Sequence, residues 1–157
     1  MIFTSPTFLY AFLPLFFIAY FAMPAMVARN AVFVAFSLLF YAWGEPVFVF
    51  VLLGSIVVNW LIGIGLADLP AERRKPLMAL GLFWNLGILG LAKYADFVLE
   101  SVGALVGTDL PKAGWALPLG VSFFCFHAIS YLVDVYRGNV GAERSLLRLT
   151  LYITMFP

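Results

Sequence analysis

The sequence carries very little charge. Only 11% of its 157 residues are Asp, Glu, Lys or Arg, nine of them basic and eight acidic. A typical soluble domain carries about 25%. So few polar groups cannot cover the surface of a small globule, which excludes a soluble enzyme. The same apolar, weakly charged composition excludes a nucleic-acid binder and a disordered tail. The net charge of +1, with no long basic run and no acidic tail, gives no sign of a nucleic-acid partner either.

Cysteine and histidine are equally scarce, because Cys125 and His127 are the single residues of their types. One cysteine cannot form an internal disulfide, so the chain indicates nothing about its redox compartment. The sequence has no CxxC or HExxH pair, and we expect no metal site. It also has no glycine-rich phosphate-binding motif, so we expect no tightly bound nucleotide or other cofactor.

Apolar residues, in contrast, make up 64% of the chain, and the mean hydropathy is +1.05. Roughly 20 apolar helical residues cross a bilayer core of about 30 Å. The composition therefore predicts an all-α, polytopic helix bundle embedded in membrane lipid. Six apolar segments are candidate transmembrane helices, near residues 8–27, 31–43, 47–67, 76–92, 117–136 and 146–157.

Proline, glycine and charge predict the boundaries of these segments. The first has no basic residue before it, unlike a cleaved signal peptide, and Pro14 is expected to kink it. The second would reach only about 20 Å. Gly44 and Pro46 indicate the turn after it. A polar loop over residues 68–75 is expected to end at Pro76, which would open the fourth helix.

The basic residues predict an orientation. Cationic residues favour cytoplasmic loops. If the amino terminus is outside and the chain crosses six times, seven of the nine basic residues fall on the cytoplasmic side, namely Arg29, Arg73, Arg74, Lys75, Arg137, Arg144 and Arg148. The other two, Lys93 and Lys112, fall outside. We therefore predict an external amino terminus.

The segment after the fourth span, residues 94–106, has a mixed pattern. Its apolar residues alternate with Asp96 and Glu100 at roughly helical spacing, and they include Phe97, Val98, Val102 and Leu105. One interpretation is an amphipathic helix on the outer membrane surface. An ordinary structured loop is the alternative.

Two asparagines lie within predicted spans, Asn59 in the third and Asn85 in the fourth. Lipid offers an amide no hydrogen-bond partner. The favoured interpretation is that the amides bind helices together, with small residues such as Ser55 and Gly63 permitting close approach. A position on a substrate pathway is the alternative.

The fifth span carries a polar stripe of His127, Ser130, Asp134 and Arg137. Their spacing of three or four residues places them on one helical face. Lipid would reject this face, so we expect it to point into protein or a wet cavity.

Serine, histidine and aspartate together suggest a catalytic triad. However, residues stacked along one rigid helix rarely converge on one reacting atom. His127 is a candidate general base, but the pattern favours a packing role. We expect Asp134 to pair with Arg137 or with another helix, and Gly138 to cap the helix.

Several stretches resemble a known family. They are FTSPTFLYAFLPLFFIAY at the start, FYAWGEP at residues 40–46, NWLIG at 59–63, KYADF at 93–97 and, above all, LPLGVSFFCFHAISYLVDVYRG at 117–138. Together they resemble the amino-terminal part of membrane-bound O-acyltransferases, especially the bacterial alginate O-acetylase type. Residues 1–157 would then be the amino-terminal transmembrane part of a longer domain. Cys125 stands where relatives often carry threonine.

The resemblance implies a multi-pass protein of the bacterial inner membrane. It would pass acyl groups, in particular acetyl groups, from acetyl-CoA or another acyl thioester to an exported polysaccharide such as alginate. An extracytoplasmic acetyltransferase would complete the transfer. The family's catalytic histidine belongs to sequence beyond the final MFP, and His127 does not match it. We therefore expect no catalytic residue in this chain.

A second class of function stays open at this point. A small non-enzymatic membrane protein, such as a transporter half or an assembly subunit, would have the same composition. Paired inverted repeats would favour a transporter. No convincing internal repeat is visible in the sequence.

Overall fold

The computed structural model describes residues 5–44, 46–107 and 120–154, except for a few side chains near residues 95–106. These residues form helices and no strand, as predicted. In chain order the elements are the π-helical turn η1 (Phe8–Phe12), α1 (Leu13–Ala22), α2 (Met26–Gly44), α3 (Phe48–Asp68), α4 (Ala71–Val106), α5 (Val121–Arg137) and α6 (Leu146–Thr154).

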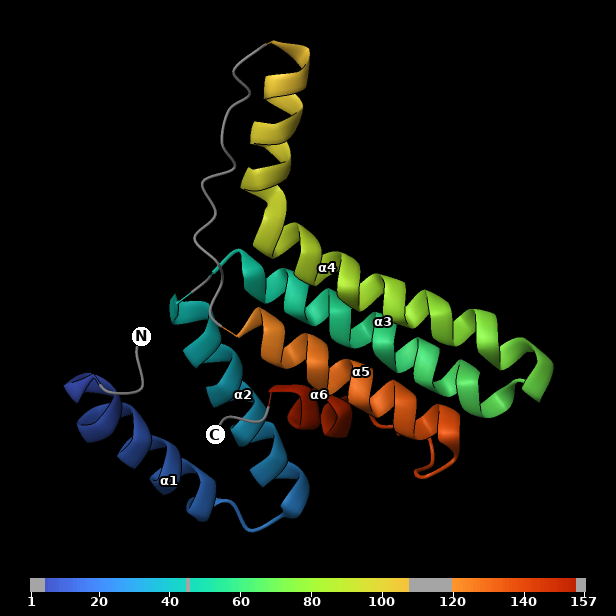
Figure 1. Ribbon diagram of the computed structural model, residues 1–157. Coiled ribbons are helices and arrows are strands. Elements are labelled where there is room, and N and C mark those ends of the chain that lie inside the picture. Colours follow the sequence, from blue (N-terminus) through green and yellow to red (C-terminus); the bar gives the residue numbers. More distant parts are fainter. Residues whose placement is uncertain (1–4, 45, 108–119, 155–157) are drawn as a thin grey trace.

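Three helices form the centre of the fold. Helix α3, the first part of α4 and α5 lie side by side, and each contacts the other two (Figure 1). Helices α1 and α2 form a hairpin beside them, and the short α6 contacts α2, α3 and α5. Most of the fully buried side chains of the core belong to this centre, including Ile56, Leu66, Val121, Cys125 and Leu132, and Leu149 of α6 packs in the same core.

The first apolar segment ends earlier than predicted. Helix α1 stops at Ala22, and Met23 adopts an extended conformation (φ −84°, ψ 124°). Proline disfavours the helical conformation in the residue before it, and Pro24 follows Met23. The Nε of Arg29 donates a 2.8 Å hydrogen bond to the Met23 carbonyl oxygen at this corner. The corner therefore divides residues 8–27 between two helices.

The second apolar helix is consequently longer than predicted. Helix α2 has 19 residues rather than the short stretch 31–43, because its first turns include the residues around Arg29. At 1.5 Å per residue it reaches about 28 Å, close to the thickness of a bilayer core. Near Pro14 the chain forms the π-helical turn η1, followed by α1 with this proline in its first turn.

The fourth helix begins before Pro76, contrary to the prediction. Helix α4 starts at Ala71, directly after Pro70, and contains Pro76 in its interior. Glu72 lies in the first turn, where an acidic side chain complements the helix dipole. The predicted polar loop is therefore mainly helical. The third span matches its prediction within one residue at each end.

Three helical stretches are long and apolar enough to cross a membrane, namely Met26–Gly44, Phe48–Asp68 and Ala71–Tyr94. Phe8–Ala22 is a shorter apolar stretch. Helices α5 and α6 are shorter as well, with 17 and nine described helical residues. Parts of the predicted fifth and sixth spans, residues 117–119 and 155–157, lie outside the described residues. The protein is a multi-pass membrane protein, and six crossings with an external amino terminus stay a prediction.

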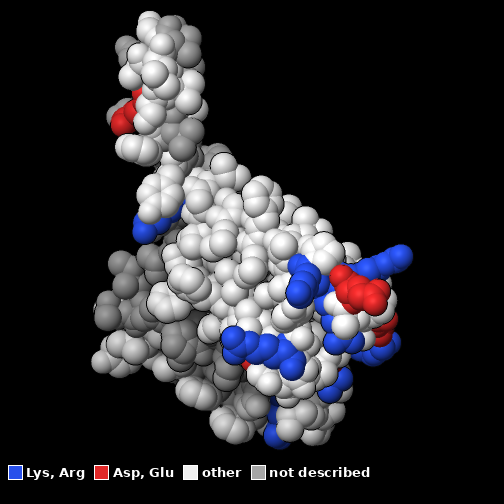
Figure 2. All heavy atoms as spheres, turned by 45° about the vertical axis from the view of Figure 1, so that its right-hand side comes forward, with Lys and Arg blue, Asp and Glu red and all other residues white. Residues whose placement is uncertain are grey.

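Basic side chains gather at one end of the central bundle (Figure 2). This end combines the carboxyl ends of α3 and α5 with the amino ends of α4 and α6, and we call it the basic end. Arg144 donates a 3.1 Å hydrogen bond to Asp68, and Arg148 forms a 3.0 Å ion pair with Glu143. Arg74 donates to the carbonyl oxygen of Leu69, just past the end of α3.

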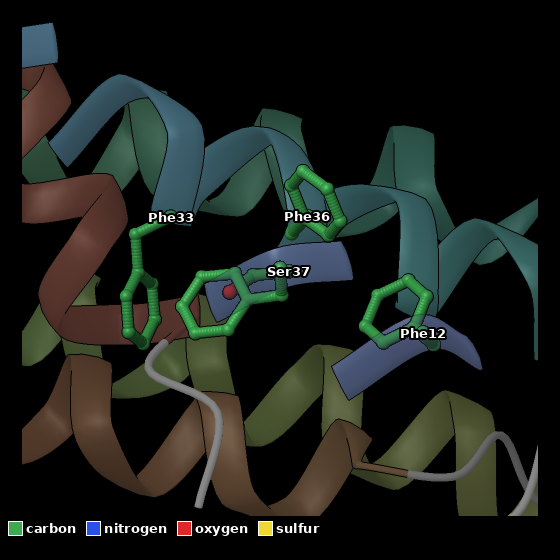
Figure 3. Close-up of a pocket in the computed structure, with 5 residues that line it drawn as sticks. Phe12, Phe33, Phe36 and Ser37 are labelled. Carbon is green, nitrogen blue, oxygen red and sulfur yellow. The ribbon is translucent and has the colours of Figure 1, made fainter. Parts of the chain in front are cut away.

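The hairpin of α1 and α2 is held by aromatic rings. Phe16 meets Phe33 and Phe36 edge to face, with centroids 5.2 and 5.5 Å apart. These rings, with Phe12 and Ser37, line a small pocket (Figure 3). Its volume of about 10 Å³ holds one water at most, so it is a packing gap rather than a ligand site.

Candidate functional site

The two intramembrane asparagines lie against each other between α3 and α4. Asn59 and Asn85 are both 0% exposed. Each Nδ2 donates to the other Oδ1, at 3.1 Å from Asn59 and 2.7 Å from Asn85. The same nitrogens also donate 2.8 Å bonds to the carbonyl oxygens of Ser55 and Gly81. Both amides are thus engaged in the low-dielectric interior, where an unpaired amide would be costly.

This mutual pairing gives the amides a structural role in the described part of the chain. Because each carbonyl oxygen accepts from the opposite amide, the pair fixes the register of α3 against α4. The sequence placed both residues inside the membrane, but it could not show that they share one depth. A site that must bind and release a substrate would need polar groups free to exchange partners, and this pair is closed.

Close approach elsewhere in the bundle depends on glycines. Tyr131 of α5 is 7% exposed and lies over Gly63 of α3. A Cβ atom at Gly63 would come within 2.5 Å of the Tyr131 hydroxyl oxygen. That oxygen accepts a 3.1 Å hydrogen bond from the backbone N–H of Glu143, in the loop before α6. Tyr131 thereby links α3, α5 and the α6 loop.

Sequence reasoning missed the role of Tyr131. A tyrosine within an apolar run has no distinctive spacing, and Gly63 lies far away in the chain. The one available signal was the glycine in NWLIG, which was interpreted as permitting close approach without naming its partner.

Helix α5 has two distinct faces. One face is buried in the central core, and it consists of Val121, Phe124, Cys125, Ala128, Tyr131, Leu132 and Val135. The predicted polar stripe lies on the other face. Ser130 and Arg137 are exposed, and His127 and Asp134 are half-buried. Within the described residues the stripe therefore does not point into the α3–α4–α5 core.

His127 lies at the seam between α5 and α6. Its ring centroid is 5.8 Å from that of Tyr152. The Nδ1 atom is buried and has no hydrogen-bond partner among the described residues. No acid, base or nucleophile faces it there at hydrogen-bond distance, so the described geometry offers no catalytic triad. Its role as a general base stays untested.

The carboxyl end of α5 follows its predicted cap. Gly138 adopts a left-handed conformation (φ 76°), and its N–H donates to the Val135 carbonyl oxygen. The N–H of Asn139 donates to the Asp134 carbonyl oxygen, completing a helix-ending motif that favours glycine. Asp134 accepts a 3.3 Å bond from the Asn139 side chain. The described contacts pair Asp134 with this loop rather than with Arg137.

No group of three or more His, Cys, Asp or Glu side chains converges among the residues that the structure describes. Helix α5 also keeps its thiol, Cys125, inside the core. In the described part of the chain, polar side chains that remain without a structural role lie on the stripe of α5 and at its seam with α6. We take this stripe and seam as the candidate functional surface.

Sequence comparisons relate the whole chain to enzymes of polysaccharide modification. It is 36% identical to a probable alginate O-acetylase of Azotobacter vinelandii and 33% identical to one of Pseudomonas aeruginosa, with 100% of the chain aligned in both cases. It is 35% identical to a peptidoglycan O-acetyltransferase of Helicobacter pylori over 88% of the chain.

The chain spans about a third of the length of these curated relatives, at 32%, 31% and 27% respectively. No protein-family model matches the chain. No solved structure matches it either. The alignments to the two alginate O-acetylases nevertheless extend over the whole of this chain. The chain therefore matches, along its whole length, about a third of proteins named alginate O-acetylase.

Proposed function

We propose that this chain is part of a membrane-bound O-acyltransferase that passes acetyl groups across the bacterial inner membrane for O-acetylation of an exported polysaccharide. The observation that carries the proposal is the 33–36% identity, over the whole of this chain, to proteins named alginate O-acetylase. The multi-pass helical fold is compatible with it, because a group that crosses a bilayer needs a protein path through the lipid.

In this proposal the chain contributes scaffold rather than the reacting base. The closed pair of Asn59 and Asn85 and the Tyr131–Gly63 contact make α3, α4 and α5 a rigid unit. The polar stripe of α5 then presents His127 and Ser130 to the remainder of the enzyme. Transfer from a thioester requires a base and the exclusion of water, and a rigid apolar bundle supports the second requirement.

The donor is proposed to be acetyl-CoA or another acyl thioester on the cytoplasmic side, where the basic end lies by the positive-inside rule. The acceptor is proposed to be an exported polysaccharide, with an extracytoplasmic acetyltransferase completing the transfer. The printed names of the relatives support an alginate or peptidoglycan acceptor.

A chimera tests this function directly. The matching third of an alginate O-acetylase is replaced by this chain in an alginate-producing bacterium that lacks its own O-acetylase. We expect the chimera to restore acetyl esters on the secreted alginate, measured by NMR of the purified polymer. The chain alone should restore none, because the family resemblance places the catalytic histidine elsewhere.

The matched control is a chimera that carries the equivalent third of a different alginate O-acetylase. An active control beside an inactive chimera, both present in the membrane at equal amounts, would contradict the proposed function. Acetylation supported by the 157-residue chain alone would contradict the scaffold role.

A further inference from the structure

The last part of α4 leaves the bundle. Helix α4 continues without a break to Val106, but beyond the predicted span its yellow portion turns sharply away and runs across the direction of α3 and α5 (Figure 1). We call residues 93–106 the arm. The arm ends at Gly107, whose positive φ of 71° is a conformation that glycine adopts readily. The helical alternative for this segment is thus correct, and the loop alternative is wrong.

The arm has an apolar face that the described residues leave uncovered. At helical spacing Tyr94, Val102 and Leu105 share one side, and their exposed fractions are 51%, 42% and 86%. Phe97, 67% exposed, flanks this side. Lys93 and Glu100, seven residues apart, are exposed at helical positions away from Leu105, and the Lys93 ammonium reaches over the Tyr94 ring, 5.5 Å from its centroid. Together these exposed side chains form an apolar patch, and such a patch marks a surface that contacts a membrane or another protein.

Three observations indicate what covers this face. The arm runs across the spans, so it lies along the bilayer plane if the spans cross the bilayer. It leaves the bundle at the end away from the basic end (Figure 2). Its apolar face continues from exposed apolar side chains of the span itself, including Phe83 at 76% and Leu91 at 68%.

We infer that the arm is an interfacial helix that lies in the lipid headgroup region opposite the basic end. Tyr94, Val102 and Leu105 enter the boundary of the acyl chains, and Lys93 and Glu100 face water. Apolar residues on one face and charges on the other are what such helices use. The arm would then hold α4 at one depth in the membrane. This inference concerns membrane placement and goes beyond the proposed function.

Site-directed spin labelling tests the inference in the full 157-residue chain. Cys125→Ser provides a cysteine-free background, and single cysteines are placed at Leu105 and Glu100. The labelled proteins are reconstituted in vesicles of phosphatidylcholine and phosphatidylglycerol. Collision with oxygen, which concentrates in lipid, is compared with collision with a water-soluble nickel chelate. Phe83→Cys serves as the lipid reference, and Lys75→Cys as the water reference.

We expect the ratio of oxygen to nickel accessibility to be several-fold higher at Leu105 than at Glu100. Leu105 should resemble the Phe83 reference, and Glu100 the Lys75 reference. Equal ratios at Leu105 and Glu100 would overturn the inference. A Leu105 label shielded from both reagents would also overturn it, because protein, including a second copy of the chain, would then cover the face. The four labelled positions are exposed, so labels there do not enter the core. Cys125 is a core residue, so every labelled protein is compared within the same Cys125→Ser background.

Discussion

The central bundle and the amino-terminal hairpin are both apolar, yet they are held together differently. In the bundle, α3, α4 and α5 share buried polar groups and glycine contacts that bring their backbones close. Helix α1 in the hairpin has no buried residue, and its contacts to α2 are largely between aromatic rings. The bundle is thus stabilised by interhelical hydrogen bonds and close glycine contacts, whereas the hairpin is stabilised by packing of aromatic rings.

The difference follows from the solvent. Moving apolar side chains from lipid into a helix interface changes their free energy little, because lipid tails are themselves apolar. Close packing and interhelical hydrogen bonds therefore decide which helices associate. Substitutions that disturb these contacts should therefore have larger effects in the bundle than in the hairpin.

The largest effect is expected at the glycine under Tyr131. In Gly63→Ala the new methyl group would overlap the Tyr131 ring, and overpacking of this kind costs about 1–3 kcal/mol. The measurement is the midpoint of SDS-induced unfolding in mixed micelles, followed by circular dichroism. The matched control is Gly54→Ala in the same helix, where a Cβ meets nothing within 4 Å. Gly54→Ala should be neutral or stabilising. Equal losses in both variants would contradict the interlock.

The next effect is expected at the amide pair. Asn59→Leu leaves the Asn85 amide without its interhelical partner and should cost about 1–2 kcal/mol in the same unfolding assay. The double variant Asn59→Leu/Asn85→Leu removes both polar groups and should be less destabilised than the sum of the single variants. Strict additivity would show that the two amides do not interact.

A smaller loss is expected in the hairpin. Phe36→Leu removes the edge-to-face contacts of this ring with Phe12 and Phe16, each worth about 0.5–1.5 kcal/mol at most. The hairpin should loosen while the bundle stays folded. The rate of amide hydrogen exchange should therefore increase in α1 and α2, with little change in α3. Phe83→Leu, at an exposed site on α4, is the control. Faster exchange throughout α3 and α5 would indicate that the two regions form one unit.

The smallest effect is expected at the basic end. Arg144→Ala removes the 3.1 Å ion pair with Asp68. The Arg144 side chain is 75% exposed and the Asp68 side chain is 55% exposed. Exposed pairs contribute about 0–1 kcal/mol, so the unfolding midpoint should barely change. A loss as large as that of Gly63→Ala would mean that charge at this end holds the bundle together.

The sequence predicted the helical class and the third span well, because apolar length is a direct consequence of bilayer thickness. Its errors lie at prolines. Pro24 turns the chain within an unbroken apolar run, whereas Pro76 lies inside a helix that was expected to start there. Hydropathy alone does not distinguish these two uses of proline.

The candidate site was only partly predictable for a related reason. The polar stripe of α5 and the Gly138 cap depend on local spacing and could be read directly. The pairing of Asn59 with Asn85 and the contact of Tyr131 with Gly63 join residues distant in the chain. Such pairs depend on the rotation and depth of whole helices, which a single sequence does not specify.

The most direct test of the account is the side of the membrane on which the basic end lies. In the Cys125→Ser background, single cysteines replace Lys75 at the basic end and Asp109 in the segment predicted outside, which lies beyond the described residues. Intact cells are treated with a membrane-impermeant maleimide. The account predicts labelling at Asp109 and, until the membrane is permeabilised, none at Lys75. Labelling at Lys75 but not at Asp109 in intact cells would contradict it.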